Sequence, residues 1–110
     1  MKIETRQEKS CRVIAVAGSA DIRASAALRQ AFLGAIEAGE TRLICDLGAT
    51  DFICSDALGV LITAYLKARG RGGFLRLASP QERLREILAT TRLDHLFEVY
   101  SNVDQAAACV

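Results

Sequence analysis

Short apolar runs alternate along the chain with longer segments in which apolar residues recur every three or four positions. Each run has the length and the β-branched or continuous apolar character of a buried strand. The runs are CRVIAVAG at 11–18, TRLICDLG at 41–48 and FLRLA at 74–78. The polar segment at 2–10 is predicted to pair with the first run as an edge strand, and ATDFICS at 49–55 is predicted to be a loop or a short extended piece.

Helical spacing predicts three helices between and after these runs. Their apolar stripes are Leu28, Phe32, Ala35 and Ile36; Leu58, Leu61, Ile62 and Tyr65; and Leu84, Ile87 and Leu88. Ser25 is the predicted N-cap of the first helix, and Gly39 is its predicted end. Ser79, Pro80 and Glu82 form a capping-box pattern at the start of the third.

Strands that alternate with helices of this length indicate an α/β fold. We therefore expect one domain over residues 1–110, built on a single mixed, mostly parallel β-sheet with helices packed against it. HLFEVY at 95–100 is expected to add a short strand, and residues 102–110 a final helix or a frayed tail. Right-handed crossovers predict that the 18–25 loop lies beside the helix start at 54–58. Gly59 is predicted to face the sheet where little space is available.

Composition narrows the function. Hydrophobic residues make up 51% of the 110 positions, so the chain is expected to fold. The net charge is +1, so neither a basic face for nucleic acid nor a polybasic membrane anchor is expected. No apolar run approaches the length of a membrane span, and the first residues do not resemble a signal peptide. These features predict a cytoplasmic protein that does not insert into a membrane.

The side chains that carry chemistry are few. Cys11, Cys45, Cys54 and Cys109 form no C-x-x-C pair, and His95 is the one histidine, so neither a metal site nor a cofactor is expected. Cys11 and Cys45 lie in apolar runs and are predicted to be buried, reduced thiols. No nucleophile elbow, phosphate-binding loop or pairing of a nucleophile with a base is present, so the chain is not expected to be an enzyme or to hold catalytic residues.

The start of the second predicted helix carries an unusual group of polar side chains. Cys54, Ser55 and Asp56 stand together where an extended segment runs into an apolar helix. Ser55 is the predicted N-cap, worth about 1 kcal/mol, and Asp56 would interact favourably with the helix dipole. A hydroxyl at a helix start is also a place where a kinase could add a phosphate, which would bring nearly two negative charges. The sequence leaves both roles of Ser55 open. Cys54 is read as an incidental small residue rather than a redox sensor, because Asp56 disfavours its thiolate.

Three segments, taken together, resemble the STAS domain of bacterial anti-sigma factor antagonists. They are GSADIRASAALR at 18–29, FICSDALGVL at 52–61 and GGFLRLASPQERLREILATTRLDHLFEVY at 72–100. In the first segment, Gly18, Asp21, Ser25, Ala26, Leu28 and Arg29 match the family pattern. The second is similar to the segment that begins the second helix of the family and carries its regulatory phosphoserine, which falls on Ser55.

The resemblance implies a specific partner. An antagonist of this family binds an anti-sigma factor that is also a serine kinase; the kinase phosphorylates it with ATP and releases it, and a phosphatase resets the cycle. The antagonist itself carries out no catalysis. The implied phosphorylation site is Ser55, and Asp21 matches the acidic residue beside it. The implied partner-binding residues are Asp21, Ser25, Cys54, Ser55, Asp56, Leu58 and Gly59.

The chain also departs from the family pattern. Cys54 replaces the Asp that precedes the serine, Asp56 stands where Ser or Thr is usual, and Ala57 replaces a Gly. Thr91, Arg92 and Leu93 stand where Thr-Gly-Leu is expected. The resemblance therefore leaves alternatives open: a STAS accessory subunit of a lipid-transporting ATP-binding cassette system, or a scaffold of a stress complex that is never phosphorylated.

Overall fold

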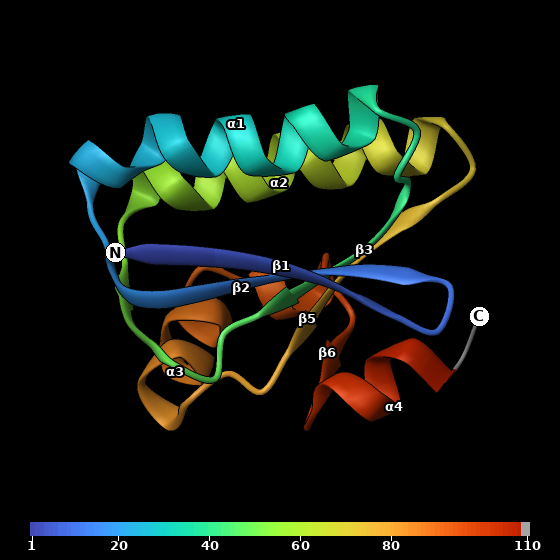
Figure 1. Cartoon of the computed structure of the whole chain (residues 1–110). Helices are drawn as coiled ribbons and strands as arrows, with labels where there is room; N and C mark the ends of the chain where they lie inside the picture. The colour runs from blue at the N-terminus through green and yellow to red at the C-terminus, as the bar shows by residue number, and fades with distance from the viewer. Residues whose placement is uncertain (109–110) are drawn as a thin grey trace.

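The computed structural model describes residues 1–108, which form a six-stranded sheet with helices on both of its faces (Figure 1). The strands are β1 (Lys2–Glu8), β2 (Cys11–Ala20), β3 (Arg42–Asp46), β4 (Thr50–Ile53), β5 (Phe74–Ala78) and β6 (Val99–Tyr100). The helices are α1 (Ser25–Glu37), α2 (Ser55–Gly70), α3 (Glu82–Thr90) and α4 (Val103–Ala108), with short 3-10 turns η1 (Ile22–Ala24) and η2 (Leu93–His95).

The sheet is mixed and mostly parallel, as predicted. Its strand order is β1-β2-β3-β5-β6; β1 runs antiparallel to β2, and the other neighbours are parallel. The long strand β2 pairs with β3 along residues 12–15 and with β4 along residues 18–20. The buried hydroxyl of Thr50 donates a 2.6 Å hydrogen bond to the carbonyl of Val16, which fastens β4 to β2.

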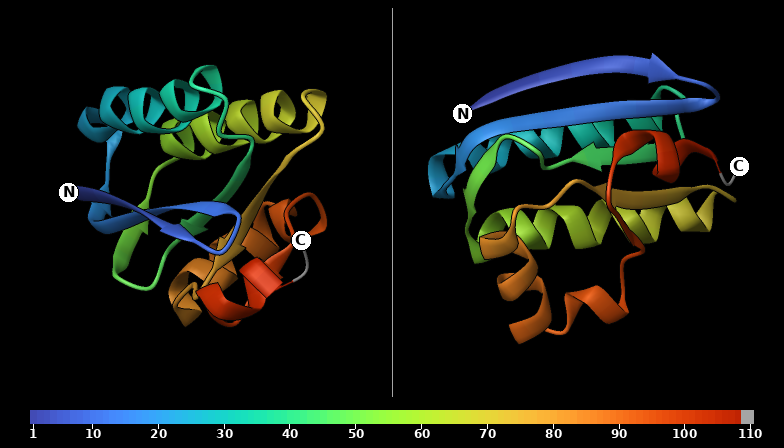
Figure 2. Two further views of the ribbon diagram at one scale, coloured as in Figure 1. Left: turned by 45° about the vertical axis from the view of Figure 1, so that its right-hand side comes forward. Right: turned by 90° about the horizontal axis from the view of Figure 1, so that it is seen from below.

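The two faces of the sheet are covered differently. Helices α1 and α2 lie side by side over one face, and α4 lies over the other (Figures 1 and 2). The larger core lies under α1 and α2 and includes Phe32, Leu61 and Leu77. Cys45 is buried in this core and Cys11 in the smaller one under α4, as predicted for both. Cys109 lies outside the described residues.

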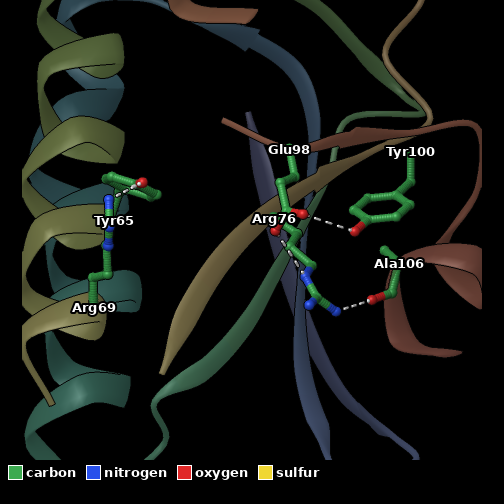
Figure 3. A network of polar contacts seen from close by, with 6 residues as sticks. All are labelled: Tyr65, Arg69, Arg76, Glu98, Tyr100 and Ala106. Atoms are coloured by element: carbon green, nitrogen blue, oxygen red, sulfur yellow. Dashed lines mark hydrogen bonds and ion pairs between the residues drawn. The ribbon is translucent and has the colours of Figure 1, made fainter. Parts of the chain in front are cut away.

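A network around Arg76 holds α4 to the sheet (Figure 3). The Arg76 guanidinium donates a 2.8 Å hydrogen bond to the carbonyl of Ala106, and it stacks 3.8 Å from the centre of the Phe74 ring. It also pairs with Glu98 at 3.4 Å, although Glu98 is exposed and Arg76 is nearly buried. The charge of a buried arginine is thus satisfied by a helix carbonyl and aromatic faces, so we assign this network to the packing of the C-terminal helix.

The start of the third helix differs from the prediction. The structure places Gln81 at the N-cap of α3 with no side-chain capping bond, so the capping box at Ser79, Pro80 and Glu82 is wrong. A proline disfavours helical geometry in the residue before it, and Ser79 adopts a positive φ of 60°. The Ser79 N–H instead donates to the carbonyl of Tyr100 at 2.9 Å, which extends the pairing of β5 with β6.

Candidate functional site

Backbone pairing brings the two predicted segments to one end of the sheet. Ala20 at the end of β2 pairs with Ile53 at the end of β4, and the Cys54 N–H donates a 2.9 Å hydrogen bond to the Ala20 carbonyl. The two strands run in the same direction, so the segments that follow them leave the sheet at the same end, which we call the edge of the candidate site (Figure 1). The predicted juxtaposition of the 18–25 loop and the start of α2 is confirmed, and η1 contacts α2 there.

Asp21 caps the turn that follows β2. Its Oδ1 accepts a 3.0 Å hydrogen bond from the backbone N–H of Arg23, and its Oδ2 accepts one from the Arg23 guanidinium at 3.1 Å. These bonds from Arg23 lower the pKa of Asp21 and so favour the charged carboxylate. The turn also presents Ile22, whose side chain is 72% exposed. The turn therefore presents an Asp21–Arg23 ion pair beside an apolar side chain.

Helix α2 begins one residue earlier than the predicted cap at Ser55 implies. Cys54 is the N-cap, and its Sγ accepts a 3.4 Å hydrogen bond from the N–H of Ala57. Ser55 is the first helical residue, so the prediction that it caps the helix is wrong. Asp56 lies in the first turn, as predicted, where the helix dipole favours its charge. The hydroxyl of Ser55 is exposed and is not used to cap the helix.

The seven predicted partner-binding residues divide by exposure. Ser55, Asp56 and Gly59 are exposed, and Asp21 and Cys54 are half-buried. Gly59 follows Ser55 by one helical turn and has open space around it, so the prediction that it faces the sheet is wrong. Asp21, Cys54, Ser55, Asp56 and Gly59 thus remain available to a partner.

Ser25 and Leu58 lie behind this surface. Leu58 is 7% exposed and packs in the main core, because it lies on the apolar stripe of α2. Ser25 is 6% exposed, and its Oγ has no hydrogen-bond partner among the described residues. The N-cap of α1 is Ala24, with no side-chain capping bond, so the predicted cap at Ser25 is wrong. Neither side chain is presented to a partner in this structure.

Two exposed apolar residues at this edge were not predicted as site residues. Ile22 follows Asp21, and Phe52 on β4 is 40% exposed although it belongs to a strand. Phe52 lines an open groove of about 380 Å³ together with residues of α3. The signal in the sequence was weak, since large apolar residues in short strands are usually buried. The exposure of Phe52 depends on where α3 packs, which is a tertiary feature.

The histidine region lies at the surface. His95 lies on η2 and is exposed, and its Nε2 is 3.9 Å from Asp94 Oδ1. His95 lines neither the groove beside Phe52 nor the hollows beside Asp21 and Arg85. Among residues 1–108, no helix is both long enough and apolar enough to cross a membrane.

Comparison with known proteins defines the family. The family profile of the STAS domain matches residues 2–106, so the chain belongs to the STAS domain family. It is 31% identical over 68 residues to a candidate anti-sigma factor antagonist of Thermotoga neapolitana, an alignment that covers 62% of this chain and 60% of that relative's length. It is 24% identical over 99 residues to the anti-sigma-B factor antagonist of Bacillus subtilis, which covers 90% of both chains.

A solved structure agrees with this assignment. The crystal structure of an anti-sigma factor antagonist from Mycobacterium paratuberculosis superposes on this chain with a TM-score of 0.89 and 26% sequence identity. The superposition covers 99% of this chain and 92% of that one. The arrangement of the strands and helices is therefore that of an anti-sigma factor antagonist fold, in agreement with the family match.

Proposed function

We propose that this protein is an anti-sigma factor antagonist that acts in the cytoplasm and binds an anti-sigma factor with serine kinase activity through the edge formed by Asp21 and residues 54–59. The observation that carries the proposal is the exposed hydroxyl of Ser55 at the first position of α2. Because Cys54 supplies the cap, Ser55 can be modified without removing a capping bond. The names of the relatives support the same role.

Phosphorylation of Ser55 is the proposed switch. A phosphate adds nearly two negative charges at a position next to Asp56 and at the same edge as Asp21. Like charges repel by about 1 kcal/mol at ~4 Å in water and by more where a bound partner excludes solvent. A partner whose docking surface is negatively charged, for example by a bound nucleotide, is therefore repelled and released from the phosphorylated protein. A phosphatase that removes the phosphate would restore binding, and the antagonist needs no catalytic activity of its own.

The experiment tests modification and binding separately. The purified protein is incubated with each serine-kinase anti-sigma factor of the source organism and ATP, and the mass of the product is measured, with Ser55→Ala as the control. We expect one phosphate on the wild type and none on Ser55→Ala, with loss of the complex only in the wild type. A kinase that binds neither form, or a phosphate at another residue, would contradict the proposal.

One observation favours a second candidate function. Asp56 already places a negative charge beside Ser55, and Cys54 replaces the acidic residue of the family pattern. These departures suit a STAS scaffold whose docking surface is fixed and never phosphorylated. A partner that binds wild type and Ser55→Ala equally and adds no phosphate would favour this function. Recovery of a transport ATPase as the sole stable partner would instead assign the chain to a lipid-transport system.

A further inference from the structure

An open groove lies beside the candidate site, between β4 and α3. Phe52 forms one wall, and Arg83, Glu86, Ile87, Thr90 and Thr91 form the other. Its volume of about 380 Å³ is sufficient for one large side chain with its neighbours. Phe52 and Ile87 supply the apolar surface, and the threonines lie at the C-terminal end of α3. The groove therefore combines an exposed aromatic anchor with a defined hollow.

The rim of the groove carries two opposite charges. Arg83 and Glu86 are both exposed and lie one turn apart on α3. Within residues 1–108, neither side chain takes part in an ion pair or a side-chain hydrogen bond. Both charges are thus available to a partner. An apolar side chain flanked by an acidic and a basic residue would complement the groove in shape and in charge.

One wall of the groove is close in the chain to the candidate site. Phe52 lies three residues before Ser55, and β4 leads through Cys54 directly into α2. A protein that reaches the Ser55 hydroxyl therefore stands beside the groove. Partly exposed aromatic residues are frequent anchors of protein interfaces, because they bury a large area when the partner docks over them.

We propose that the groove is a second docking point for the anti-sigma factor kinase, which inserts an apolar side chain against Phe52 and Ile87 and pairs a carboxylate with Arg83. This inference rests on the proposed function, since it assumes that the kinase is the partner. The groove lies outside the phosphorylated residue, so it contributes to affinity and to the choice of partner but not to phosphoryl transfer. In this proposal Ser55 carries the phosphate that controls binding, and the groove determines which kinase binds.

The test separates docking from chemistry through kinetics. Phosphorylation of Ser55 by the purified anti-sigma factor kinase is measured for the wild type, Phe52→Ala and Thr90→Arg, the last of which fills the groove without removing a core side chain. We expect KM to rise by about 10-fold in both variants while kcat changes by less than about 2-fold. The control Leu66→Ala removes another exposed apolar side chain, 59% exposed on α2, and is expected to behave as the wild type.

A charge reversal tests the rim. Arg83→Glu is expected to raise the KM by about 10-fold, whereas Arg85→Glu, the same change on the same helix but outside the groove, is expected to leave it within about 2-fold. A KM unchanged in Phe52→Ala, Thr90→Arg and Arg83→Glu would overturn the groove as a docking point.

The outcomes distinguish the groove from the proposed function. If the wild type is phosphorylated on Ser55 but the groove variants match it, the groove proposal fails and the function stands. If no anti-sigma factor kinase binds or phosphorylates the wild type, both fail. If the groove variants instead dissociate a wild-type dimer in analytical ultracentrifugation while the KM is unchanged, the groove is a self-association surface and the proposal is overturned.

Discussion

The backbone N–H of Cys54 donates a 2.9 Å hydrogen bond to the carbonyl oxygen of Ala20. This bond joins the residue that follows β4 to the last residue of β2, and it places Asp21 and Ser55 at one edge of the sheet. The juxtaposition depends on main-chain pairing rather than on contact between the two side chains. Substitutions at Ser55 should therefore leave this geometry intact, so that their effects on partner binding can be interpreted directly, whereas substitutions at Asp21 also remove the cap of η1.

The identity of the N-cap at residue 54 should control the stability of α2. The Cys54 Sγ is a weak acceptor, and it lies 3.4 Å from the N–H of Ala57. A serine hydroxyl is a preferred cap, whereas alanine offers no acceptor. We expect stability to decrease in the order Cys54→Ser, wild type, Cys54→Ala, with about 1 kcal/mol between the two variants. Urea unfolding of the three proteins measures this order, and equal stabilities would show that the thiol does not act as a cap.

Ser55→Ala should be nearly neutral for stability, because Ser55 is exposed and does not cap α2. We expect a change of less than about 0.5 kcal/mol in the free energy of unfolding. Asp56→Asn serves as the comparison, since it removes a charge that interacts with the helix dipole and should cost about 0.3–1 kcal/mol. A loss of 1 kcal/mol or more in Ser55→Ala, measured by thermal unfolding, would restore the capping role that the sequence had suggested.

The strands and helices could be predicted because burial imposes a pattern on the sequence. The apolar run that became β3 and the stripe on α1 with Leu28, Phe32 and Ile36 are buried as predicted. The helix starts were less predictable. Whether a residue caps a helix depends on its backbone conformation, which the residue type does not fix. The three predicted cap serines, Ser25, Ser55 and Ser79, lie one or two positions away from the actual caps.

The candidate site was partly predictable for a related reason. The positions of Asp21 and Ser55 followed from the topology of parallel strands, which sequence patterns indicate. The burial of Ser25, the open space around Gly59 and the exposure of Phe52 depend on how α1, α2 and α3 are turned against the sheet. Such rotations result from packing between distant segments, and single-sequence periodicity does not specify them.

Two glycines should respond in opposite ways to alanine. Gly59 lies inside α2 on its exposed face, and an added Cβ meets nothing within 4 Å, so Gly59→Ala should stabilise the protein by about 0.5–1 kcal/mol through helix propensity. A Cβ at Gly73 would instead collide with the carbonyl group of Thr41, and Gly73→Ala should cost about 1–3 kcal/mol. Paired urea titrations measure both. A destabilised Gly59→Ala variant would show that this helix face is packed in solution.

Alkaline pH should weaken the fold through the buried thiol of Cys45. Burial, with a smaller effect from the charge of Asp46, raises the pKa of Cys45 far above its ordinary value. In the unfolded chain, cysteine ionises near pH ~8.5, so the unfolded state releases a proton that the folded state retains. The contribution of Cys45 is therefore complete below about pH 8.5 and is lost as the pH rises, by up to about 1.4 kcal/mol per pH unit.

Cys11, whose pKa is also raised by burial, should act in the same direction as Cys45. The measurement is the free energy of unfolding in urea between about pH 7 and about pH 10 under reducing conditions, for the wild type and for Cys45→Ala. The variant should be less stable at neutral pH, because it loses buried atoms, but its stability should fall less steeply as the pH rises. Parallel curves for the two proteins would attribute the alkaline loss to other groups.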